Sequence, residues 1–118
     1  MSCKYAPRGY ATFSTADLDE AKQSIKDGAG LIFGWHFGNA AASIRYVKVY
    51  DATVSGTTVG TTVPKLRIQL PASGGATVYF EAGIRFDTGM TIACVTGAAD
   101  NSTGAPAAND VTASVFFV

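Results

Sequence analysis

Charged side chains are scarce in this sequence. They make up 15% of the 118 residues, whereas an ordinary soluble domain carries roughly 25%. The nine basic residues balance the nine acidic ones, so the formal net charge is zero at pH 7 with histidine neutral. A chain without a basic excess has no electrostatic field with which to hold nucleic acid. Scarce charge and zero net charge favour association with other protein surfaces, and no nucleic-acid partner is expected.

Histidine and cysteine are also scarce, which limits the chemistry available. His36 is the one histidine, and it lies among aromatic residues where the imidazole is expected to pack or hydrogen-bond locally. One histidine and two distant cysteines, Cys3 and Cys94, do not form a zinc-binding set. Two free thiols made in a reducing compartment are expected, although a disulfide between them is the alternative.

The acidic residues form no recognisable catalytic pattern. Glu81 and Asp87 are candidates for the paired carboxylates of a glycosidase, but surface ion pairs to Arg85 or Arg67 are the expected role. Three oxygen donors match no calcium-loop spacing and are expected to make local turns: Asp100, Asn101 and Asp110. We therefore expect no enzyme activity, metal, cofactor or small-molecule substrate.

Long apolar segments are missing as well. No stretch reaches the length of a membrane-spanning helix, and the N-terminal sequence MSCKYAPRGY lacks the apolar core of a signal peptide. The sequence therefore predicts a protein made in a cytoplasm, with no membrane partner.

The sequence does contain short segments with the composition and alternation of β-strands. They recur near the roughly 8–12-residue spacing of a sandwich or barrel, and no room is left for the helical crossovers of a parallel sheet. We expect an all-β, antiparallel β-sandwich of seven or eight strands with jelly-roll-like connections. Periodicity leaves immunoglobulin-like and other Greek-key orders open. The expected strands lie at residues 31–37, 43–50, 65–70, 77–80, 83–86, 90–95 and 110–118.

Two of these segments are predicted to form a hairpin. Residues 65–70 alternate cleanly, with Leu66, Ile68 and Leu70 on the inner face. The following segment 71–75, PASGG, has the composition of a turn, so residues 77–80 are expected to return antiparallel to 65–70. The segment 43–50 alternates less cleanly, which indicates a strand partly covered on both faces.

The first 27 residues differ from the rest. The sequence STAD at residues 14–17 fits a helix-capping box, and the spacing of Leu18, Ala21 and Ile25 fits a short helix or turn. Residues 21–27 also fit a first strand. We interpret residues 1–27 as an extended or partly helical N-terminal arm and residues 28–118 as the β-sandwich domain.

Contacts with a partner are expected from this arm and from two loops rich in small, neutral residues, 51–63 and 97–109. Aromatic residues on strands also allow a sugar-stacking platform, formed by Trp35, Tyr46, Tyr50 and Tyr79. The candidate protein-contact residues are Tyr5, Pro7, Arg8, Tyr10, Thr57, Thr58, Val59, Asn101 and Pro106.

Four segments carry a resemblance to a known class of proteins. IRYVKVYD (44–51), LRIQLPASGG (66–75), GIRFDTGMTIACVTGAADNST (83–103) and DVTASVFFV (110–118) resemble segments of small structural proteins from tailed bacteriophage particles. The resemblance covers about residues 28–118. It implies a β-sandwich subunit at the capsid surface of the virion that cements or decorates the shell, often as a trimer, with the major capsid protein or another virion protein as partner. A tail, baseplate or head-fibre component and a carbohydrate-binding module are the alternatives.

Overall fold

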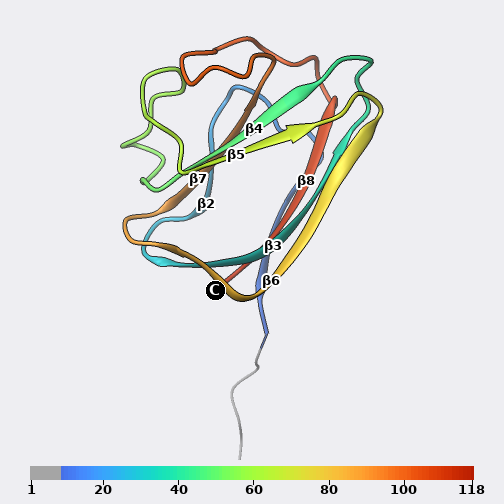
Figure 1. Cartoon of the computed structure of the whole chain (residues 1–118). Coiled ribbons are helices and arrows are strands. Elements are labelled where there is room, and N and C mark those ends of the chain that lie inside the picture. Colours follow the sequence, from blue (N-terminus) through green and yellow to red (C-terminus); the bar gives the residue numbers. More distant parts are fainter. Residues whose placement is uncertain (1–8) are drawn as a thin grey trace, which may run out of the picture.

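The chain folds into eight β-strands arranged in two antiparallel four-stranded sheets that face each other (Figure 1). The computed structural model describes residues 9–118, and these residues contain no helix. The predicted all-β sandwich is therefore confirmed. The strands are β1 (Ala11–Thr15), β2 (Gln23–Lys26), β3 (Gly30–Asn39), β4 (Arg45–Tyr50), β5 (Leu66–Leu70), β6 (Gly74–Phe86), β7 (Met90–Val95) and β8 (Val111–Phe117).

The strand order is that of a jelly roll. Sheet A has the order β1-β8-β3-β6, and sheet B has the order β2-β7-β4-β5. The first strand pairs with the last, the second with the seventh, the third with the sixth and the fourth with the fifth. This is one long antiparallel ribbon rolled into two layers, which is the eight-stranded double-sheet arrangement. The predicted jelly-roll connections thus hold.

The core lies between the two sheets and follows the alternation of the strands. Phe37 and Val115 contribute from sheet A, and Val47 and Ile92 contribute from sheet B; all four side chains are at most 1% exposed. On β5, the predicted inner residues Leu66, Ile68 and Leu70 do face this core. Period-two alternation thus identifies the inner face of these strands correctly.

Of the alternatives left open for this region, the short helix is wrong, and the first strand within residues 21–27 is confirmed. Residues 11–15 form β1 and residues 23–26 form β2, so both are edge strands of the sandwich. An extended path lets Phe13 pack on the core and buries Leu18 completely, with its backbone N–H bonded to Val111 O at 2.9 Å. Tertiary pairing therefore overrides the local capping pattern. The predicted arm of residues 1–27 accordingly contains two strands of the sandwich.

The predicted hairpin between residues 65–70 and 77–80 is also wrong. β5 pairs with β4 in sheet B, while β6 pairs with β3 in sheet A. The turn at residues 71–73 carries the chain from one sheet to the other, with Ser73 in a left-handed conformation at φ 50°. Residues 77–80 and 83–86 belong to a single strand, β6, and not to two separate strands.

Irregular pairing interrupts β3 near its middle. Ile32 and Gly34 pair with Phe117 and Phe116 on β8, which leaves Phe33 as an inserted residue. On β6, the same two residues pair with Ile84 and Tyr79, so residues 80–83 lie opposite Phe33. A bulge changes the direction in which a side chain projects. Here it allows both Ile32 and Trp35 to be buried, although they are three positions apart and regular alternation would place them on opposite faces.

Candidate functional site

The outer face of sheet B is covered by two loops of the same chain. We call residues 51–65 and 96–109 the loop layer; they follow β4 and β7 and lie at the left and top of Figure 1. Lys48, on the outer side of β4, donates hydrogen bonds from Nζ to Ala98 O at 3.1 Å and Ala99 O at 2.9 Å. Thr91 Oγ1 donates to Ala52 O at 2.8 Å. These contacts hold both loops on the sheet, so β4 is covered on both faces, as predicted.

The two loops also contact each other. Gly60 has a φ of 91°, and a Cβ at this position would lie 2.5 Å from Thr103 Cγ2 and 3.4 Å from Asn101 O. A side chain at residue 60 would therefore separate the loops. The sequence analysis identified these two loop regions separately, and in the structure they form one continuous surface.

Two of the three charged residues of the loop layer, Asp51 and Asp100, are engaged in hydrogen bonds or an ion pair within the protein. Asp51 accepts hydrogen bonds from the backbone N–H groups of Asp87 and Thr88 at 3.1 and 2.8 Å. These bonds outweigh the partial desolvation of the carboxyl, and the pKa of Asp51 is lowered. Asp100 is paired with Arg67 at 2.6 Å. Lys65, the third charged residue, is exposed at the end of the layer, with Nζ 5.2 Å from the centroid of the Phe86 ring. All other residues of the layer are uncharged, and Val63 is 69% exposed among them.

The candidate contact residues lie in different environments. Thr58 and Asn101 are exposed, and Val59 is half-buried. Thr57 is fully buried and Pro106 is also buried, so their side chains cannot reach a partner. Thr57 Oγ1 instead donates to Thr53 O at 2.8 Å. Tyr10 is exposed and lies beside sheet A, whereas three further candidates lie outside the described residues: Tyr5, Pro7 and Arg8.

The outer face of sheet A, in contrast, is open. Three rows of its side chains across the strands carry no formal charge when His36 is neutral. Beyond the row that contains Tyr79, the face also carries two exposed charged residues of β6, Glu81 and Arg85. The middle row, Ser14–Ser114–His36–Thr77, consists mainly of hydroxyl groups. Within it, His36 Nδ1 and Thr77 Oγ1 are 2.7 Å apart. His36 thus makes the local hydrogen bond that the sequence predicted. The rows are Thr12–Phe116–Gly34–Tyr79, Ser14–Ser114–His36–Thr77 and Thr112–Gly38–Gly75.

An aromatic cluster stands at one end of this open face. Tyr10 stacks on Phe33 with ring centroids 4.6 Å apart and meets Tyr79 edge-on at 5.9 Å. The hydroxyl groups of Tyr10 and Tyr79 are hydrogen-bonded to each other, which raises the pKa of Tyr79. Tyr10 is 42% exposed and Tyr79 is 60% exposed. The ring of the inserted residue Phe33 packs against that of Tyr10. The sequence did not predict this role for Phe33, because a bulge leaves no periodic pattern.

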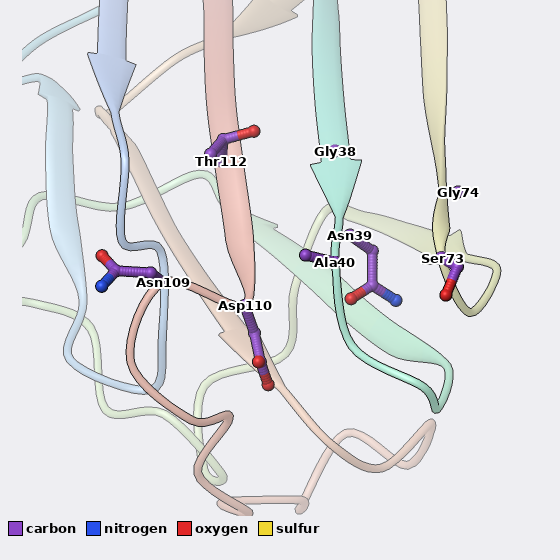
Figure 2. Close-up of a pocket in the computed structure, with 8 residues that line it drawn as sticks. All are labelled: Gly38, Asn39, Ala40, Ser73, Gly74, Asn109, Asp110 and Thr112. Atoms are coloured by element: carbon purple, nitrogen blue, oxygen red, sulfur yellow. The ribbon is translucent and has the colours of Figure 1, made fainter.

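A hollow of about 400 Å³ lies at the opposite end of the open face (Figure 2). It forms where Gly38 and Gly74 carry no side chain, between the end of β3 and the starts of β6 and β8. Thr112 stands at its border, and Asp110 lines it with a carboxylate already paired with Arg45 at 3.1 Å. Asn39, also in the lining, is 4% exposed. The hollow is shallow and is bordered by small polar groups.

The aromatic platform expected from the sequence is not assembled. Trp35 is 8% exposed and packs in the core against Phe37 and Phe80, while Tyr50 is 1% exposed under the loop layer. Of the four residues proposed for it, Tyr79 reaches the open face of sheet A. The proposed platform residues thus lie on different faces of the sandwich, although the sequence grouped them because all are aromatic.

The acidic residues do not converge on a common site. Asp87 pairs with Arg85 at 3.0 Å on the surface, which is the pairing that the sequence predicted. Asp100 and Asp110 belong to separate ion pairs, with Arg67 and Arg45 respectively. Within residues 9–118, no three His, Cys, Asp or Glu side chains are grouped to bind a metal ion.

Cys94 is a free, fully buried thiol on β7. Burial raises the pKa of Cys94 to about 12, because the thiolate would lose its hydration. Cys3, the other member of the alternative disulfide, lies outside the described residues.

Comparison with other proteins gives no further assignment. The part of the chain that the structure describes includes no helix that is long and apolar enough to span a membrane. Models of protein families, curated protein sequences and solved structures were compared with the chain, and none matches it.

Proposed function

We propose that this chain is a structural protein of a virus particle that binds an assembled capsid shell and stabilises it through protein–protein contacts. The observation that carries the proposal is the loop layer, a surface with few charged residues that contacts within the chain hold in place before any partner binds. A surface that is already ordered loses little conformational entropy on binding. The resemblance of four segments to phage particle proteins agrees with it, as does the jelly roll, although a fold alone does not determine a function.

Stabilisation follows from mass action. A protein that binds neighbouring subunits in the shell, but not the free subunits, shifts the equilibrium toward the assembled shell. The exposed residues Thr58, Val63 and Asn101 are the proposed contacts, and residues 1–8 precede β1 and supply further candidates. A homotrimer on the shell remains part of the proposal.

The decisive experiment combines copy number with binding. Mass spectrometry of purified particles is expected to find hundreds of copies of this chain. Added to shells that lack it, the purified protein should raise the temperature at which the shells dissociate. Val63→Asp should weaken shell binding at least about tenfold, because it places a charge in a desolvated contact.

Thr12→Asp is the matched control, since it adds the same charge to the open face of sheet A and should leave shell binding unchanged. Equal effects of the two variants would remove the loop layer from the proposal. A handful of copies per particle would favour a tail, baseplate or head-fibre component instead, and absence of the chain from particles would defeat both assignments.

A further inference from the structure

We propose that the open face of sheet A binds a neutral oligosaccharide, from the aromatic cluster at one end to the hollow at the other. This proposal does not depend on the capsid role, because it concerns the sheet opposite the loop layer. Its contact residues are Tyr79, His36, Thr77 and Thr112, which come from three neighbouring strands.

The chemistry of the face fits a ligand that carries hydroxyl groups. β8 and β3 are interior strands, so their backbone groups pair with neighbouring strands and side chains supply the binding groups. The middle row offers three hydroxyl groups and one imidazole, all able to donate and accept hydrogen bonds. A sugar presents the same kind of groups, and the C–H-rich side of its ring packs on aromatic surface such as Tyr79.

The composition also argues against protein as the occupant of this face. Binding energy at protein interfaces is concentrated in Trp, Tyr and Arg, whereas Ser and Thr contribute little. Two tyrosines at one edge and a centre of Ser, Thr and Gly do not provide a central anchor. The three rows contain no lysine or arginine; at the Tyr79 end, Arg85 is already paired with Asp87 at 3.0 Å, and the exposed Glu81 would repel an acidic polysaccharide.

The dimensions suit a short chain of sugar rings. From the row that contains Tyr79 to the row that contains Thr112, β3 advances four residues, from Gly34 to Gly38, which is about 13 Å along the strand. The hollow beyond Thr112, with a volume of about 400 Å³, offers space for one further ring at the glycine-lined end (Figure 2). Pockets that hold small ligands combine apolar surface with a few polar groups in this way.

The test uses the full chain, a set of neutral oligosaccharides and a set of acidic ones. Glycan-array screening followed by calorimetry should find neutral oligosaccharides that bind in preference to acidic ones. Tyr79→Ala and His36→Ala should each weaken that binding at least about tenfold. Thr58→Ala on the loop layer is the matched control and should bind normally. Trp35 fluorescence, which reports on the core, verifies that each variant is folded.

Three results would overturn the proposal: no neutral oligosaccharide binds at millimolar concentration, acidic ones are preferred, or the two variants bind as tightly as the natural sequence. Sedimentation without glycan adds a fourth, because self-association that is lost in Tyr79→Ala would identify the face as a protein interface. Shell binding should be unchanged in Tyr79→Ala, so failure here and failure of the capsid role are separately measurable.

Discussion

Arg67 and Asp100 form a bidentate ion pair that ties the edge strand β5 to the loop after β7. Arg67 Nε and Nη2 lie 2.6 and 2.7 Å from the two carboxylate oxygens of Asp100. The hydrogen bond from Arg67 also lowers the pKa of Asp100. The pair is close to half-exposed, so its function is to position the loop more than to stabilise the whole fold.

We predict that Asp100→Asn loosens this loop locally. The amide of Ser102, which donates to Ala99 O at 3.0 Å, should exchange its hydrogen about twofold to fivefold faster. Hydrogen-exchange mass spectrometry measures this rate. Asp87→Asn, which breaks the exposed pair with Arg85, should leave the Ser102 amide unaffected. Equal exchange in both variants would contradict a positioning role for Asp100.

Lysine side chains on strands are usually exposed, but that of Lys48 is buried, and we expect it to be important for stability. It is 2% exposed, and desolvation lowers its pKa, but its Nζ holds two loop carbonyl groups. Lys48→Met should reduce the free energy of unfolding by about 1 to 3 kcal/mol, because both carbonyls lose their partner. Urea unfolding followed by Trp35 fluorescence is the measurement. Lys65→Met, at an exposed position, should change stability far less.

Asn39 connects the end of β3 to two turns. Its Nδ2 donates to Ser43 O and Pro71 O, both at 3.0 Å, and its Oδ1 accepts from Ala41 N at 3.0 Å. Asn39→Ala should lower the free energy of unfolding by about 2 to 4 kcal/mol, since several buried groups lose partners. Asn101→Ala, on the exposed loop layer, provides the comparison. Similar stability of the two variants would rule out this role for Asn39.

Asp51 should make stability depend on pH in the acidic range. Its folded pKa is below the ordinary value, so its contribution is complete above about pH 4 and is lost as the pH falls toward the folded pKa. Asp51→Asn should be less stable by about 1 kcal/mol at pH 7, and the difference should shrink in acid. Urea unfolding at a series of pH values tests this, and a difference that stays constant would contradict it.

The Cys94 thiol should be unreactive in the native protein. With a pKa of about 12 and no exposed surface, it can meet a thiol reagent only after the sandwich opens. In a Cys3→Ser background at pH 8, labelling should be at least about a hundredfold slower in native buffer than in concentrated guanidinium chloride. Rapid labelling of the folded protein would contradict this prediction, because it would show that reagent reaches Cys94 on β7 without unfolding.

Most strands could be predicted from the sequence because a half-buried strand alternates. In the segment 110–118, every second residue is apolar, and the structure turns that face toward the core: Val111, Ala113, Val115 and Phe117. Alternation states which side of a strand is inward, but not which strand lies beside it. For this reason the sequence predicted a hairpin where β5 and β6 belong to different sheets. A capping pattern at residues 14–17 likewise competed with pairing to β8, and pairing prevailed.

The sequence by itself determined the class of this protein: all-β, two-layered, neutral, with loops of small residues. Only the tertiary structure decided which surfaces are available, because burial depends on neighbours far along the chain. It buried Thr57 and Pro106, joined the two loops over sheet B, and left sheet A open. The rows of that open face combine Thr12 and Phe116 with Tyr79, residues that no local pattern could bring together.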